Sequence, residues 1–200
     1  MLNILILAAG KSSRMRGRDK LAEVVEGAPL LRTMAQRALG TGYPVCVVLA
    51  PHDTTRHKMI SDLPIATIIA KDAARGMAHS LAAGVAALPE TCTAAMVVLA
   101  DMPELTAPDL AYLATEWARL PDESILQATS EDGRPGHPVI FPNTVFDDLA
   151  ELTGDQGAKS VIAASRDVLH RIPLSGQHAV LDLDTPEAWD SWHRAQSNAK

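Results

Sequence analysis

A run of small and basic residues follows directly on the first apolar segment of the chain, residues 2–7. The run reads AAGKSSRM, and Lys20 lies a few residues further on. Small side chains let backbone amides approach a ligand closely and form an anion-binding nest, to which Arg14 and Lys20 can add charge-assisted hydrogen bonds. The run therefore predicts phosphate binding, and a solvated basic turn is the alternative. The small residues concerned are Ala8, Ala9, Gly10, Ser12 and Ser13.

This loop matches neither of the common phosphate-binding motifs. Gly10-Lys11-Ser12 resembles the end of a P-loop, but that motif has a glycine five residues earlier, where this chain has Leu5. No GxGxxG sequence of the dinucleotide-binding kind follows. The scattered histidines form no HExxH pair, and no Gly-x-Ser-x-Gly elbow occurs. A P-loop ATPase, a zinc hydrolase and a serine hydrolase are therefore disfavoured.

Three aspartates could hold a hard cation. Asp101 directly follows the apolar run 94–100, and the next helix has its own cap candidate in Thr106. Asp101 is then free for Mg²⁺, which takes carboxylate and phosphate oxygens; an Asx turn is the alternative. Asp182 and Asp184 alternate with leucines, which predicts that both point to one side of a strand. They would complete a metal site with Asp101, although a solvent-facing strand edge has the same pattern.

Two segments of the second half of the chain could contact another ligand. The turn-rich GRPGHP is predicted to be rigid and exposed, and it would offer Arg134 and His137; a plain loop is the alternative. The segment GDQG precedes a helix whose N-terminus could receive an anion, with Lys159 nearby. Here the alternative is a helix-entry turn capped by Asp155.

Composition and charge restrict the class of protein. The 200 residues, 47% hydrophobic and 21% charged, suit one soluble globular domain. A net charge of −6 disfavours non-specific nucleic-acid binding. The two cysteines form no CxxC pair, so we expect neither disulfides nor structural zinc, and a cytoplasmic location fits best. The apolar N-terminal run has no positive residues before it and is too short to cross a membrane, so we expect a strand.

Apolar runs alternate with segments of helical spacing. Residues 2–7, 45–50, 65–70 and 94–100 have the composition of buried strands, and apolar residues recur at helical intervals over 81–88 and 110–120. This alternation predicts a doubly wound, mostly parallel α/β sheet with helices on both faces. Ligands bind at the carboxyl ends of such strands, where the first loop and Asp101 both lie.

The pattern changes after about residue 121. Strands are predicted at SILQATS, HPVIF, VLHRIPL and HAVLDLD, and helices over about 143–152 and 158–164. A last helix is predicted after Thr185-Pro186, with Thr as the cap and Pro in the first turn. We expect one domain over residues 1–200.

Five motifs in one order resemble the MobA-like nucleotidyltransferases, and within them the molybdenum cofactor cytidylyltransferase branch. The resemblance extends from Leu5 to about Trp189 and is more specific than any single motif. It implies a Rossmann-like fold with an NTP-binding half over about 1–120 and an acceptor-side half over about 121–195. The motifs are LAAGKSSRM with DKL, LADMP, GRPGHPVIF, LTGDQGAK and LDLDTPEAW.

The resemblance implies transfer of CMP from CTP to the phosphate of molybdenum-loaded molybdopterin, with release of pyrophosphate. The cofactor is Mg²⁺, and the product is the form used by xanthine-dehydrogenase-type enzymes. Residues 8–10 are assigned to base and ribose, Arg14 and Lys20 to the triphosphate, and Asp101 with Asp184 to the metal. In-line attack needs positioning and charge neutralisation, and a phosphate acceptor needs no general base.

The remaining assignments concern base selection and the acceptor. Gly76 and Ser80 fall in the segment that helps select the nucleobase, although Ser80 alone could simply be buried. The GHP and GDQGAK regions face the acceptor. The chain departs from the family at Arg16, which precedes Gly17 where the glycine usually follows the methionine directly.

Other functions stay open at this point. A guanylyltransferase typically has Leu-Ala-Gly-Gly in the first loop, whereas this chain has Ala9 before Gly10, which favours cytidine. A sugar-phosphate nucleotidyltransferase has the same fold. A carrier of molybdenum cofactor would not need a triphosphate and metal site, so the set of Arg14, Lys20 and Asp101 argues against it.

Overall fold

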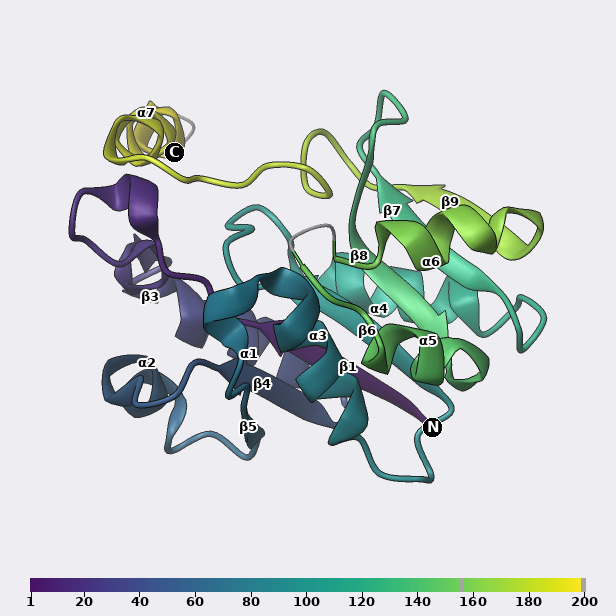
Figure 1. Cartoon of the computed structure of the whole chain (residues 1–200). Coiled ribbons are helices and arrows are strands. Elements are labelled where there is room, and N and C mark those ends of the chain that lie inside the picture. The colour runs from purple at the N-terminus through teal and green to yellow at the C-terminus, as the bar shows by residue number, and fades with distance from the viewer. Residues whose placement is uncertain (155–156, 199–200) are drawn as a thin grey trace.

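A seven-stranded sheet forms the centre of the computed structural model, which describes residues 1–154 and 157–198 (Figure 1). The strand order is β5-β4-β1-β6-β8-β7-β9, and every pairing is parallel except those that β8 makes with β6 and β7. The predicted doubly wound, mostly parallel sheet is thereby confirmed. The strands are β1 (Leu2–Leu7), β4 (Val45–Leu49), β5 (Ala66–Ile69), β6 (Ala94–Leu99), β7 (Ile125–Thr129), β8 (Pro135–Pro142) and β9 (Leu169–Pro173), and β2 (Val24–Val25) and β3 (Ala28–Pro29) form a separate pair.

Helices cover both faces of the sheet because the central strands are apolar on both sides. In β1, Ile4 and Ile6 pack into one core with α1 and α4, whereas Leu5 and Leu7 pack into a second core with α3. The helices are α1 (Leu30–Leu39), α2 (Thr54–Ile60), α3 (Met77–Ala86), α4 (Ala107–Trp117), α5 (Phe146–Ala150), α6 (Lys159–Ala164) and α7 (Pro186–Asn198). Among the described residues, none of these helices is long and apolar enough to cross a membrane.

The register of the strands gathers the loops at one edge. Leu7 of β1 lies opposite Val48 of β4 and Leu99 of β6, so the loops that follow these strands meet at their carboxyl ends. Strand β8 is antiparallel, with Val139 opposite Val97, and its first residues therefore lie beside the last residues of β6. Thr106 caps α4 in a capping box with Asp109, as predicted, so Asp101 is not the cap of that helix.

The strand predicted over 178–184 is not formed. The amides of Val180 and Leu181 both donate to the carbonyl oxygen of Gln177 at 2.9 Å, so a turn takes the hydrogen bonds that a sheet ladder would need. The chain continues as an irregular segment to Thr185, whose hydroxyl accepts from the Ala188 amide at 3.2 Å at the start of α7. The predicted cap is confirmed.

Helix α7 returns the end of the chain to its beginning. The segment after β9 crosses the sheet edge, and α7 lies beside the first loop (Figure 1). Trp189 is fully buried and donates from Nε1 to the Leu183 carbonyl at 3.1 Å, while Glu187 pairs with Arg16 at 2.7 Å. This docking fixes the position of the two aspartates that precede the helix.

Gly136 lets this segment lie against β8. A Cβ at Gly136 would lie 1.9 Å from the Ala179 carbonyl oxygen, which accepts a hydrogen bond from the His137 amide at 2.8 Å. We expect Gly136→Ala to lower the free energy of unfolding by about 3 kcal/mol, because backbone must move to relieve the overlap. Urea denaturation measures the change. Gly10→Ala is the control, since a Cβ there meets nothing within 4 Å; an equal loss in both variants would contradict the account.

Candidate active site

The loop after β1 is held by a buried arginine of α2. Arg56 is 5% exposed, and its Nη1 donates to the carbonyl oxygens of Ala8 at 2.6 Å and Gly10 at 2.7 Å. Its Nε and Nη2 donate to the two carboxylate oxygens of Asp19 at 2.8 and 2.7 Å. Burial raises the pKa of Asp19, but Arg56 outweighs it and the pKa lies below its ordinary value. Both ends of the loop are thus tied to one guanidinium.

Ser12 belongs to the same network. Its hydroxyl donates to Asp19 at 3.1 Å and accepts from the Lys20 amide at 3.3 Å, and its φ of 50° turns the chain. Arg16 and Gly17, where the sequence departs from the family pattern, also have positive φ, at 53° and 89°. Ser12 and Ser13 line a separate cavity that Ala9, Gly10 and Arg56 also line, and neither serine lines the cavity that Ala8 and Lys20 line. Their predicted role toward a nucleotide stays a prediction.

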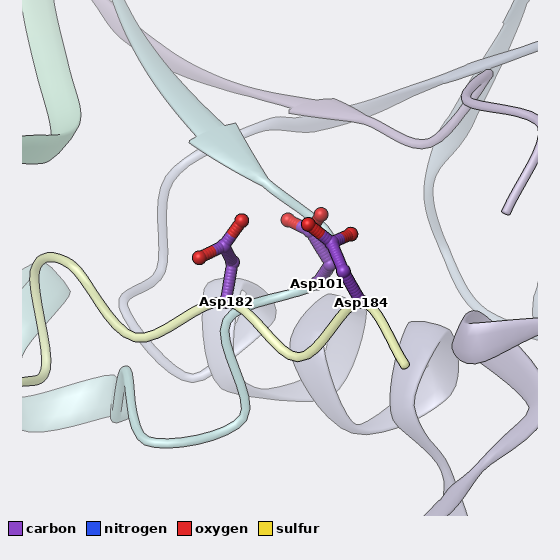
Figure 2. Close-up of side chains that lie close together, drawn as sticks. All are labelled: Asp101, Asp182 and Asp184. Carbon is purple, nitrogen blue, oxygen red and sulfur yellow. The ribbon is translucent and has the colours of Figure 1, made fainter. Parts of the chain in front are cut away.

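Three carboxylates gather at the carboxyl edge of the sheet. One oxygen from each of Asp101, Asp182 and Asp184 lies within 4.8 Å of the others. Figure 2 shows that Asp182 and Asp184 come from one irregular segment and Asp101 from the chain after β6. The predicted grouping occurs without the predicted strand, because buried Leu183 anchors the segment between the two aspartates.

Two basic side chains of the first loop neutralise this cluster. The Lys20 ammonium contacts Asp101 and lies 2.7 Å from Asp184 Oδ1, and Arg14 lies 2.5 Å from Asp184 Oδ2. Burial pulls the pKa of Lys20 down, but the two carboxylates together raise it above its ordinary value. Lys20 therefore stays charged at neutral pH. The Arg14 side chain is 70% exposed although it is paired with Asp184.

The cluster suits a divalent cation. Burial and the neighbouring carboxylates of Asp184 and Asp101 raise the pKa of Asp182. The negative charge of the cluster therefore disfavours ionisation of Asp182, and a bound cation would relieve that repulsion. Among the described residues, the buried Oδ1 of Asp101 has no hydrogen-bond partner. An unpartnered buried carboxylate oxygen beside two further carboxylates is the kind of donor set that hard cations take.

A cavity of about 320 Å³ adjoins the cluster. It brings together most of the residues that the sequence assigns to a nucleotide: the loop after β1, the start of α3 and the end of β6. Gly76, with φ of 127°, lets α3 begin beside the loop. Ser80 is buried and also lines the cavity, so its burial is compatible with the predicted role in selecting the nucleobase. The predicted site residues that line this cavity are Ala8, Ala9, Gly10, Lys20, Gly76, Ser80 and Asp101.

A second cavity of about 890 Å³ lies beside the first, and Leu7 and Met77 line both. His137 and Lys159, two of the residues predicted for the acceptor, line it. Arg134 does not; it is exposed and pairs with Asp132 at 3.2 Å at the turn between β7 and β8. Asp155 falls outside the described residues.

His137 differs from its prediction. His137 lies within β8, in keeping with the strand predicted at HPVIF, but the predicted exposure of GRPGHP is wrong for it, because its Nδ1 is buried with no hydrogen-bond partner among the described residues. Burial lowers the pKa of His137. It outweighs the backbone hydrogen bond at Val97 and the charge of Asp101, which both raise the pKa. The ring is therefore neutral at pH 7, and its unpaired Nδ1 is buried beside the cavity that His137 lines.

Sequence reasoning missed Arg56, Arg166 and Arg171. Arg56 lies in the polar stretch HDTTRHKM, which has the composition of a solvated helix. Arg166 and Arg171 line the larger cavity. The seven-residue interval from Lys159 to Arg166 has the spacing of a shared helical face, but α6 ends at Ala164 and Arg166 lies in the 3₁₀ turn that follows.

Comparison with known proteins identifies relatives of this fold. A family model described as MobA-like NTP transferase domain matches residues 4–169. The crystal structure of the Rv0371c homologue from Mycobacterium sp. strain JC1 has a TM-score of 0.84 at 24% identity, over 100% of this chain and 98% of that chain. No curated protein sequence matches the chain.

Two further structures carry ligands. The manganese complex of Rv0371c from Mycobacterium tuberculosis H37Rv has a TM-score of 0.78 at 21% identity, over 95% of this chain and 96% of that chain. The complex of CMP:2-keto-3-deoxy-manno-octonic acid synthetase with CTP has a TM-score of 0.77 at 12% identity, over 100% and 99%. At these identities the likenesses establish the fold.

Arg56 should matter more for stability than an arginine on the surface. We expect Arg56→Met to lower the free energy of unfolding by about 3 kcal/mol, because Asp19 and two carbonyl oxygens lose their partner. The control is Arg119→Met, which removes an exposed arginine that pairs with Glu116 at the end of α4 and should cost less than about 1 kcal/mol. Chemical denaturation of both variants measures the difference, and similar losses would refute the assignment.

Proposed function

Since the chain belongs to the MobA-like NTP transferase family and is therefore a nucleotidyltransferase, we propose that it transfers CMP from CTP to the phosphate of molybdenum-loaded molybdopterin. Pyrophosphate is the second product. The cytidylylated cofactor would serve a xanthine-dehydrogenase-type apoenzyme. We place the reaction in the cytoplasm, in keeping with the free thiols of Cys46 and Cys92.

One observation carries the proposal: two cavities of different character adjoin next to the acidic cluster. The smaller one is lined by the loop after β1, Lys20 and Asp101, and the larger one by His137 and Lys159. A transferase with two substrates needs this arrangement, because the reacting groups must be held in contact. We assign the smaller cavity and the half up to about residue 120 to CTP, and the larger cavity and the half over about 121–195 to the acceptor.

In the proposed reaction an oxygen of the acceptor phosphate attacks the α-phosphorus of CTP in line with the leaving group. The new bond joins the two phosphates, and the bond from the α-phosphorus to the bridging oxygen of pyrophosphate breaks. Lys20 stabilises charge on the transferring group, since it stays protonated at neutral pH. Arg14, which is exposed, binds the departing pyrophosphate together with the loop amides.

We assign Mg²⁺ to Asp101 and Asp184, with Asp182 as a further ligand. Bound there, Mg²⁺ would neutralise phosphate charge and orient the triphosphate. Lys20 now contacts both Asp101 and Asp184. Its ammonium must move aside from at least one carboxylate when a cation binds, and it then faces the nucleotide.

On the acceptor side, neutral His137 and charged Lys159 are the proposed contacts. Arg134 would act only if the turn between β7 and β8 moves over the cavity, because it now pairs with Asp132. A guanylyltransferase, a sugar-phosphate nucleotidyltransferase and a cofactor carrier are the alternatives.

The choice of nucleotide and acceptor can be measured together. We expect pyrophosphate release with CTP and Mg²⁺ only when molybdenum-loaded molybdopterin is present, and little with GTP, ATP or UTP. Coupled pyrophosphate detection measures the rates. Release with GTP would overturn the base, and release only with a sugar phosphate would overturn the acceptor. Binding of CTP without any release would favour the carrier.

Metal binding should respond in opposite directions to two substitutions. Asp101→Asn removes a ligand and should weaken Mn²⁺ binding by about tenfold or more. Lys20→Gln removes the competing ammonium and should tighten Mn²⁺ binding while it slows transfer. Electron paramagnetic resonance of free Mn²⁺ measures both without turnover. Asp122→Asn, at an exposed turn, is the matched control. Unchanged affinity in Asp101→Asn would eliminate the metal assignment.

A further inference from the structure

Trp189 of α7 binds the backbone on both sides of Asp184. Its Nε1 donates to the carbonyl oxygen of Leu183 at 3.1 Å, and its backbone amide donates to the carbonyl oxygen of Thr185 at 3.1 Å. The indole is fully buried, and the Leu183 side chain is buried with it in the core below the sheet edge. The two residues that flank Asp184 are therefore both hydrogen-bonded to one residue of the helix.

The chain that follows Asp101 is also held in place. Met102 and Leu105 are buried, and Arg37 of α1 donates from Nη1 to the carbonyl oxygens of Pro103 at 2.8 Å and Leu105 at 2.7 Å. These bonds satisfy backbone acceptors in an irregular stretch that has no sheet ladder. The stretch can therefore serve as a fixed base against which another element docks.

Helix α7 docks on this stretch through a second tryptophan. Trp192 donates from Nε1 to Glu104 Oε1 at 3.1 Å, and its ring packs edge-on against Trp189 with the ring centres 5.7 Å apart. One continuous set of contacts thus runs from the chain after Asp101, through the two indoles, to the backbone of Asp184. This set determines how far apart the two aspartates lie.

The backbone contacts differ from the contacts of the carboxylate in one respect. The Asp184 carboxylate is held by Lys20 at 2.7 Å and Arg14 at 2.5 Å, and these cations compete with a metal ion for the same oxygens. The hydrogen bonds from Trp189 involve carbonyl oxygens only, so they can persist when a metal ion displaces the cations. The position of Asp184 then depends on its backbone.

We propose that Trp189 is a positioning residue, which holds Asp184 at the separation from Asp101 that a shared divalent cation requires. The inference rests on the metal site proposed above and is independent of the identity of the acceptor. Mg²⁺ demands nearly octahedral geometry with short bonds to oxygen, so a small displacement of one carboxylate weakens binding. Groups that orient metal ligands without touching the metal typically contribute 10–100-fold to metal affinity.

Metal binding by Trp189→Phe tests the inference without turnover. The substitution keeps a buried aromatic ring and removes the donor to Leu183, and the dissociation constant of Mn²⁺, measured by electron paramagnetic resonance, should rise about tenfold. Trp117→Phe is the matched control, because it removes a donor to the Ser124 carbonyl at 3.3 Å at the far end of α4. Its dissociation constant should change less than about twofold. Circular dichroism at the temperature of the measurement establishes that both variants are folded.

The outcomes separate this inference from the proposals on which it rests. Unchanged Mn²⁺ affinity in Trp189→Phe would overturn it and leave the metal site standing if Asp101→Asn still weakens binding. Equal weakening in Trp117→Phe would overturn it as well, since the effect would then be a general loss of packing. Absence of Mn²⁺ binding in the wild-type chain would overturn the metal site and the inference together.

A tryptophan analogue decides the question if Trp189→Phe does not fold. β-(3-Benzothienyl)alanine has the same bicyclic shape, with sulfur in place of the Nε1–H group. In a Trp117→Phe/Trp192→Phe chain it would occupy position 189 alone, and the same chain with ordinary tryptophan is the reference. Weaker Mn²⁺ binding by the analogue chain would support the role of the Nε1 donor, and equal binding would overturn it.

Discussion

The contact of Lys20 with Asp101 and Asp184 is the interaction on which the rest of the site depends. These residues are 81 and 164 positions from Lys20 in the chain, so one ammonium joins the first loop, the end of β6 and the segment before α7. Two carboxylate charges that lie within 4.8 Å of each other repel by about 3.5 kcal/mol or more at an effective dielectric constant of 20. The cluster can persist only while cations balance it, and Lys20 and Arg14 do so from the loop after β1.

Rigidity of the first loop has a different origin. Its amides are positioned by Arg56, which satisfies carbonyl oxygens of Ala8 and Gly10 and holds Asp19 at the far end. The loop is therefore ordered without a ligand, and a nucleotide bound there as we propose would not bear the entropic cost of ordering it. A guanidinium suits this role because its five donors lie in one plane and reach several acceptors at once.

The sequence predicted what local patterns determine. Buried runs identified β1, β4 and β6, and Thr106 was recognisable as a cap from its position before a helical repeat. The pairing of Asp182 and Asp184 was predicted for a wrong reason, since alternation with leucines indicated a strand that the turn at Gln177 prevents. Arg56 and Arg171 could not be predicted, because their roles depend on which distant segments the fold places against them. The burial of His137 was missed, although the strand at HPVIF was predicted, because the burial comes from the pairing of β6 with β8, which no local pattern indicates.

Strand β8 has a consequence for how proteins of this fold can diverge. Because it runs against its neighbours, its first residues lie at the ligand edge, and the turn that connects it to β7 is at the same edge. The residues of β8 that follow the turn, Pro135, Gly136 and His137, line the larger cavity, and none of them lines the smaller one. Insertions or deletions in the turn would therefore shift the wall of the larger cavity and leave the smaller one unchanged. If the two cavities hold the two substrates as we propose, evolution can exchange the acceptor by editing one hairpin while the nucleotide chemistry is inherited.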